Sequence, residues 1–247
     1  MKNLGRLGFV VTILLASACS KSETVESEDI RTSGIYPEIT VLAEGNGKST
    51  ATVKLKVGGD DSNTTLELTG KDELTCTAGD ESKKLTQSGD SYKTTFATDE
   101  AGTEFVFSFD RGDEDENAPN SHVILPDPFS IEGVESSTEV SRADDELTVT
   151  WDASDANDTH SWTLKGDCLF DTDGDVSKDG TVTLKGDDFN ATPSAEKEDA
   201  TDEEKQCKAT LCIERKRVGG LDPAFKSEEG GEIRAIQKRC VSFVSVP

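Results

Sequence analysis

The sequence of 247 residues predicts an all-β protein built from two sandwich domains in tandem. Three observations support this prediction. Nearly every apolar run alternates with period two, which is typical of strands with one buried face. Clusters of Gly, Asp and Asn separate the runs, and these residues favour turns. One strand–turn–strand pattern also recurs at a distance of 96 residues.

The alternating segments place their apolar side chains on one face and their polar side chains on the other. In "TATVKLKV", for example, Val53 and Leu55 alternate with Lys54 and Lys56. No amphipathic helix is evident. We therefore expect strands near 50–57, 64–70, 104–109, 121–126, 146–152, 160–166, 181–186, 209–218 and 240–246.

The internal repeat sets the predicted domain division. Residues 52–72 align without a gap on 148–168, with Leu55 matching Trp151 and Leu66 matching Trp162. Any two amphipathic hairpins share alternation and turn residues, but an ungapped register over about 21 positions favours a true repeat. The predicted organisation is a first domain over 34–127, a linker over 128–135, and a second domain over 136–247 with an acidic loop at 191–206.

The segment "LTVTWDAS" (147–154) resembles the tryptophan-bearing strand of fibronectin type III domains, in which the indole lies between the two sheets. The repeat distance is also the size of one immunoglobulin-type sandwich. The resemblance implies two immunoglobulin-like β-sandwich domains.

The N-terminus has the pattern of an export signal. Lys2 and Arg6 precede an apolar run over 7–15, the small residues 16–18 follow, and then comes Cys19. The run is too short for a permanent membrane span. An ordinary signal cleaved near Ala18 is the alternative to the interpretation that follows.

The cysteine after these small residues resembles the lipobox of bacterial lipoproteins, although Ala16 stands where Leu is common. The resemblance implies removal of residues 1–18, a diacylglycerol on Cys19 and acylation of the new N-terminus. Ser20 favours the outer membrane and leaves open which face the protein occupies. The polar, acidic segment 19–33 is expected to be a flexible tether.

Charge and cysteine content narrow the possibilities further. A net charge of −24 argues against nucleic-acid binding, which depends on neutralising phosphates. With Cys19 lipidated, an exported protein would form disulfides among the remaining cysteines. Four lie in the last third of the chain and allow three pairings. We expect Cys168–Cys207, which would close the loop 191–206, and Cys212–Cys240, which would join two strands of a terminal hairpin. Cys76 is expected to be a buried strand residue.

The segment "DTDGDVSKDG" (171–180) is the best cation candidate, because Ca²⁺ binds closely spaced carboxylates. Its acidic residues are Asp171, Asp173, Asp175 and Asp179. The segment fails as an EF-hand loop, since Val176 and Val182 replace the required Gly and Glu. We expect an acidic turn, with bound calcium as the minor alternative and no other cofactor.

Two charged motifs have simpler interpretations. The tripeptide Arg111-Gly112-Asp113 is known from adhesion ligands, but its acidic surroundings predict a solvated turn. The basic cluster Arg215-Lys216-Arg217 is predicted to be an exposed strand end. The alternative is that it faces an acidic patch of the other domain or of a partner.

The sequence therefore favours a lipid-anchored, non-catalytic protein of the cell envelope that binds or scaffolds a protein or glycan partner. It contains no strained nucleophile turn and no phosphate-binding loop. The alternatives are an enzyme that acts on envelope polysaccharide through loop carboxylates, and a calcium-dependent adhesion module.

Overall fold

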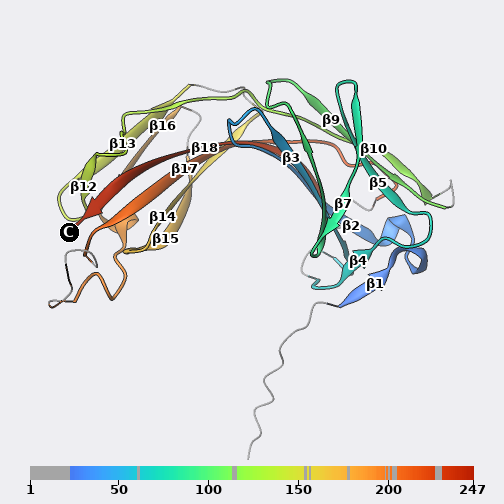
Figure 1. Cartoon of the computed structure of the whole chain (residues 1–247), viewed down its shortest axis with the longest axis horizontal. Helices are drawn as coiled ribbons and strands as arrows, with labels where there is room; N and C mark the ends of the chain where they lie inside the picture. Colours follow the sequence, from blue (N-terminus) through green and yellow to red (C-terminus); the bar gives the residue numbers. More distant parts are fainter. Residues whose placement is uncertain are drawn as a thin grey trace, which may run out of the picture.

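One continuous β-sheet runs through both halves of the molecule, which has the form of an arch (Figure 1). The computed structural model describes residues 23–59, 62–112, 116–152, 155, 157–176, 179–197, 199, 201, 205–225 and 230–247. The all-β prediction is confirmed, because strands dominate these residues and short 3-10 turns interrupt them: η1 (Ser27–Asp29), η2 (Thr32–Gly34) and η4 (Gly186–Phe189). No helix among the described residues has the length and apolarity needed to cross a membrane.

The shared sheet contains eleven strands in the described part of the chain, in the order β1-β4-β3-β2-β18-β17-β14-β15, with β7, β8 and β12 paired beside this path. Its strands in the first half are β1 (Thr24–Glu26), β2 (Ile35–Ala43), β3 (Ser49–Val57), β4 (Thr65–Glu67), β7 (Thr86–Ser88) and β8 (Ser91–Phe96). Its strands in the second half are β12 (Glu139–Ser141), β14 (Thr159–Gly166), β15 (Leu169–Val176), β17 (Cys207–Val218) and β18 (Glu232–Val246).

A smaller sheet covers each half of the shared sheet. The first lobe is closed by the sheet β10-β9-β5-β6, and the second lobe by the sheet β11-β13-β16. The bounds of these strands are β5 (Glu73–Ala78), β6 (Glu81–Lys84), β9 (Glu104–Asp110), β10 (Ala118–Ile124), β11 (Ile131–Glu132), β13 (Glu146–Trp151) and β16 (Thr181–Lys185).

The two lobes have separate apolar cores. Phe105, Phe107 and Phe109 of β9 fill the first core, while Trp151 of β13 and Trp162 of β14 fill the second. These side chains alternate along their strands with exposed or half-exposed ones, so the period-two pattern decides which face is buried.

The hairpin of β17 and β18 belongs to both lobes. The start of β18 pairs in parallel with β2, from Glu232 opposite Glu38 to Gln237 opposite Ala43. Its end pairs in parallel with β12, and β17 pairs with it throughout. Ile233 therefore lies in the first core and Phe243, ten residues later, in the second.

The connection between β17 and β18 also closes the first lobe. Phe225 lies in the first core and stacks on Phe109, with 6.3 Å between ring centroids. The Asp222 carboxylate accepts the Asn120 N–H at 2.9 Å, which joins the connection to β10. Leu221, Ala224, Phe225, Ile233 and Ala235 lie in the range predicted for the second domain, yet they pack in the first core.

The repeated pattern is used differently in the two lobes. In the first copy, β3 and β4 pair with each other in the shared sheet at Lys56 and Thr65. In the second copy, β13 and β14 lie in different sheets and face each other across the core. Alternation specifies which side of a strand is buried, but not which sheet the strand joins.

Two segments expected to be connectors are part of the folded lobes. In the range 128–135, predicted as a linker, Phe129 is buried in the second core and Ile131 pairs with β13. In the range 19–33, predicted as a flexible tether, residues 23–33 dock on the first lobe. There β1 pairs with β4, and Ser27 and Thr32 are buried. The segment 19–33 is polar overall, and small residues such as Ser27 and Thr32 are enough to bury parts of it. The segment 128–135 contributes Phe129, Ile131 and Val134 to the second core.

Candidate binding surface

The uncovered face of the shared sheet is the candidate binding surface. The β18 residues in the two cores, Ile233, Ala235 and Phe243, are odd-numbered in both lobes, so the two smaller sheets cover the same face and leave the other open. On the open face Ile236 is buried by its neighbours. Figure 1 shows the shared sheet on the inner side of the arch. We call this open side the inner face. It is defined by Glu38, Thr40 and Leu42 of β2, Thr52, Lys54 and Lys56 of β3, Glu214 and Lys216 of β17, Ile236 and Lys238 of β18, Thr163 and Lys165 of β14, and Asp171, Asp173 and Asp175 of β15.

Charges of both signs alternate across the inner face. Lys56 pairs with Glu38 at 2.5 Å in the first lobe, and Lys238 pairs with Glu214 at 3.0 Å beside the second lobe. Rows of threonine separate these pairs. Although the net charge of the chain is strongly negative, the inner face contains Lys54, Lys56, Lys165, Lys216 and Lys238. A ligand placed there would meet hydroxyls and mixed charges on a flat, hydrogen-bonded support.

Arg215 fixes the relative position of the two lobes, although it was predicted to lie at an exposed strand end. Its side chain is only 1% exposed, because residue 215 is an inward position of β17. Its guanidinium donates to the backbone carbonyls of Asp127 and Asp152 and to Nε2 of His160, the last at 3.2 Å. It also lies 4.8 Å from the centre of the Phe129 ring. One cation thus holds the connection between the lobes against the shared sheet.

Arg217 lies beside Arg215 and pairs with Asp158, and we call these three residues and His160 the junction. Its Nε donates to one carboxylate oxygen of Asp158 at 2.7 Å and its Nη2 to the other at 3.1 Å, and Asp158 is fully buried. The hydrogen bond from Arg217 to this carboxylate raises the arginine pKa, whereas burial lowers the pKa of Arg215. Because Asp158 is paired in a two-pronged geometry, this buried ion pair is specific in position as well as in charge.

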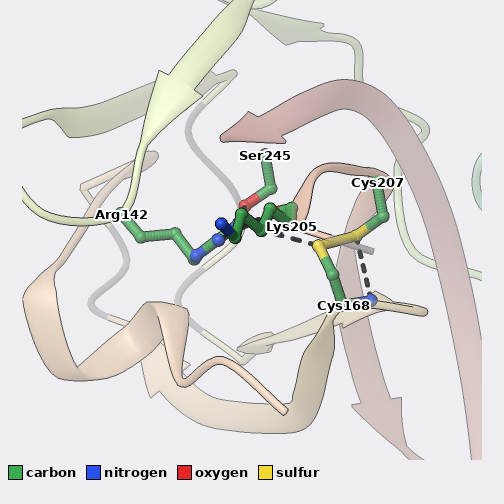
Figure 2. Close-up of a disulfide and its surroundings, with 5 residues drawn as sticks. All are labelled: Arg142, Cys168, Lys205, Cys207 and Ser245. Carbon is green, nitrogen blue, oxygen red and sulfur yellow. Dashed lines mark hydrogen bonds between the residues drawn. A yellow bond between two sulfur atoms is a disulfide. The ribbon is translucent and has the colours of Figure 1, made fainter. Parts of the chain in front are cut away.

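The disulfides of the structure are the two expected pairs. Cys168 is bonded to Cys207, and Cys212 is bonded to Cys240. Figure 2 shows the first bond with Arg142, whose guanidinium donates to the backbone carbonyl of Lys205 at 2.7 Å and to Oγ of Ser245 at 3.1 Å. Burial lowers the pKa of Arg142. Arg142 thus connects the turn between β12 and β13 to the C-terminal end of β18 and to the segment just before β17.

The second disulfide crosses the inner face. Cys212 and Cys240 are directly opposed in β17 and β18, with 4.0 Å between their Cα atoms. It therefore links the two strands that both lobes share.

The aspartates of the candidate calcium segment lie along a strand instead of around a turn. Asp171, Asp173 and Asp175 alternate along β15 and are exposed, and the Asp171 carboxylate pairs with Lys165 at 2.6 Å. Asp179 lies beyond the strand. Alternate residues of a strand are about 6.6 Å apart, which is too far for them to surround one ion. Within the described ranges, no group of three or more His, Cys, Asp or Glu side chains could hold a metal ion.

Arg111 of the adhesion-like tripeptide is buried, whereas the sequence predicted a solvated turn. Its side chain is 7% exposed and pairs with Asp72, whose side chain is 4% exposed, at 3.1 Å. It also donates to the carbonyls of Ser27 and Ile30. The guanidinium is therefore fully used in holding residues 23–34, and Asp113 lies outside the described residues.

The other residues considered in the sequence analysis are Cys76, the two histidines and Cys19. Cys76 is buried in β5, as expected, and burial raises the pKa of its thiol to about 12. His160 is buried in the junction, while His122 lies on β10, where its backbone pairs with Gly220. Cys19, the predicted lipidation residue, lies outside the described residues.

The sequence singled out Arg215 and Arg217 as a basic cluster but favoured an exposed strand end, and it gave no role to Arg142. One signal was available. Arg215 occupies an inward position in the alternation of "ATLCIERKRV", after Leu211 and Ile213, and an inward arginine requires buried partners.

Comparisons with known proteins identify no family for this chain. No family model matches it. No curated protein matches it either. Solved structures that align with it include the adhesin InvE of Yersinia pseudotuberculosis, at 12% identity and a TM-score of 0.23, over 84% of this chain and 58% of that one. Fibronectin(III)-like modules of CbhA from Clostridium thermocellum align at 11% identity and a TM-score of 0.23, over 84% of this chain and 94% of that one. The two tandem V-type regions of VCBP3, a v-region-containing chitin binding protein, align at 12% identity and a TM-score of 0.21, over 86% of this chain and 99% of that one.

Proposed function

We propose that this protein is a lipid-anchored, non-catalytic component of the bacterial cell envelope that binds or scaffolds a partner through the inner face. Cys19 carries the lipid, the outer membrane is the location, and the partner is a protein or a glycan of the envelope. No cofactor takes part.

The arrangement of the inner face is the observation that supports this proposal most. A shared sheet supports the face across both lobes, and the junction around Arg215 fixes its curvature. The buried charges described above bond to backbone carbonyls or to one another. They hold the fold together, whereas the inner face presents hydroxyl and charged groups to solvent. This division between a rigid support and a polar face suits recognition.

The partner surface can be tested by photo-crosslinking in cells. A benzophenone amino acid would replace Thr52 or Thr163 on the inner face, and matched controls would replace the exposed Thr148 or Thr181 on the opposite side. We expect discrete adducts with envelope protein from the inner positions only. For a glycan partner, the purified protein should sediment with isolated peptidoglycan, and charge reversal at Lys216 should weaken this more than charge reversal at Lys185.

Adducts that form only from Thr148 or Thr181 would contradict the assignment of the inner face. Crosslinking and sedimentation that both fail at the inner positions would also contradict it.

The anchor is tested separately by mass spectrometry and fractionation. The intact protein should lack residues 1–18 and carry diacylglycerol and an acyl chain on Cys19, and a Cys19→Ala variant should leave the membrane fraction. An unmodified Cys19 in the mature protein would end the lipid-anchor proposal.

A further inference from the structure

Residues 23–34, which we call the strap, are fixed to the end of the first lobe that contains β4. This end is the lower one in Figure 1. Strand β1 within the strap pairs in parallel with β4, and the Thr65 N–H donates to the Glu23 carbonyl at 2.9 Å. The Thr69 N–H donates to the buried Ser27 hydroxyl at 2.9 Å. The strap is thus bonded to the fold from its first described residue onward.

Three contacts further along hold the rest of the strap. Arg111 donates to the Ile30 carbonyl at 2.7 Å, and the Thr32 N–H donates to the Glu116 carboxylate at 2.7 Å. The Glu28 side chain lies against Gly70, in space that any Cβ at that position would occupy. Because Gly70 also has a φ of +62°, the turn beside the strap suits glycine on two grounds.

The strap leaves very little chain between the lipid and the fold. Only Ser20, Lys21 and Ser22 separate Cys19 from Glu23. Four residue steps span at most about 14 Å even when fully extended. The headgroup layer on each side of a bilayer is itself roughly 5–8 Å deep.

We propose that the strap holds the lower end of the first lobe, formed by β1, β4 and η1, directly against the lipid headgroups. This inference rests on the proposed lipidation of Cys19. A flexible tether of 15 residues would instead have let the lobe move tens of ångströms from the membrane. The first lobe is therefore the part of the molecule that contacts the membrane.

The chemistry of this end of the lobe indicates which lipid surface it fits. Its exposed side chains include more carboxylates than cations: Glu23, Glu26, Glu28, Asp29 and Glu67 against Arg31 and Lys71. Anionic headgroups would repel this surface. The short connection between Cys19 and Glu23 therefore holds the lobe close to the bilayer, and the lipid surface that fits this end of the lobe is zwitterionic.

Energy transfer to a labelled membrane would measure this arrangement on the full lipidated protein. A donor dye would be attached at Glu67→Cys, beside the strap, or at Glu44→Cys, at the opposite end of the first lobe. Strand β3 separates these ends by about 26 Å. Both variants remove one exposed carboxylate, and Cys76 is buried and does not compete for the dye. The vesicles would be phosphatidylcholine with an acceptor-labelled lipid.

We expect transfer from position 67 to exceed that from position 44 by at least about twofold. Ten Gly/Ser residues inserted between Ser22 and Glu23 should bring this ratio toward one while the protein still floats with the vesicles. Equal transfer from both positions in a floating, uninserted protein would overturn this inference and leave the lipid anchor intact. Failure to float would overturn the lipid anchor itself and, with it, the inference.

Discussion

The two lobes reach stability by different means. Among the residues that the structure describes, the first core contains 23 buried apolar residues and the second 17. The second lobe holds the Cys168–Cys207 bond and the Arg142 contacts, whereas the first lobe lacks a disulfide in its described part and is closed by the strap and Phe225. A larger core can stabilise a sandwich by burial, while a smaller one gains from covalent links that restrict the unfolded chain.

The comparison also shows what couples the lobes. β18 contributes to both cores, and Arg215 bonds the connection between them. Two probes separate the lobes experimentally. Both tryptophans lie in the second core, and Cys76 lies in the first. Tryptophan fluorescence therefore reports on the second lobe, and thiol labelling reports on the first.

The largest effect is expected from removing the disulfide of the second lobe. A Cys168→Ser, Cys207→Ser variant should lose about 4 kcal/mol of unfolding free energy, from the chain entropy of the 39-residue separation. Urea unfolding should show a lower midpoint for tryptophan fluorescence than for Cys76 labelling. Equal shifts of both probes would mean that the lobes unfold as one unit, and the comparison would then be wrong.

The junction should give the next largest effect. Arg215→Ala leaves two buried carbonyls and His160 without their donor, so we expect a loss of about 3 kcal/mol. The transitions of the two probes should also separate, because the lobes lose one of their connections and keep only the shared strands. Lys216→Ala, on the opposite face of the same strand, should change the unfolding free energy by less than about 0.5 kcal/mol. Similar losses in both variants would argue against the junction.

Releasing the strap should reduce the unfolding free energy by a smaller amount. Arg111→Gln removes the pair with Asp72 and the bonds to the strap, for an expected loss of about 2 kcal/mol. Trypsin should then cleave after Arg31 faster than in the native protein, while tryptophan fluorescence stays unchanged. Lys71→Gln is the matched control at an exposed neighbouring position. Cleavage at the native rate in Arg111→Gln would show that the strap does not depend on this arginine.

The smallest effect concerns the Cys76 thiol. Burial raises its pKa from 9.0 to about 12, so the folded state keeps the thiol neutral where the unfolded state ionises. Its contribution to stability is full below pH 9 and declines as the pH rises toward 12, by roughly 1 kcal/mol at pH 10. Cys76→Ala should flatten this part of the stability profile, measured by urea unfolding. A profile unchanged by this substitution would contradict the assigned burial.

The sequence was informative where local pattern decides structure. Period-two alternation predicted most of the strands and the burial of Leu55, Phe107 and Trp162, but it missed β2 and β8, and it assigned β15 to a turn. The disulfide partners followed from the expected terminal hairpin and the acidic loop. These features depend on neighbours in sequence, and an apolar face needs only some opposing layer to bury it.

Sheet membership was beyond this reasoning, since pairing between β2 and β18 joins residues almost 200 positions apart. The candidate surface was missed for the same reason, because the inner face exists only once the hairpin joins the two lobes. Arg111 was assigned to the surface because of its acidic surroundings, and Arg215 because clustered charges are typical of exposed strand ends. Their burial depends on distant carbonyls that no local pattern reveals.

The position of β18 also sets the order in which the molecule can assemble. During synthesis the first lobe emerges early, but its β2 edge and part of its core await a segment that emerges long afterwards. Contacts between such distant segments form slowly. Until then the open edge is exposed to unwanted pairing with other chains. Folding of this protein therefore favours a chaperone that shields that edge until β18 has been made.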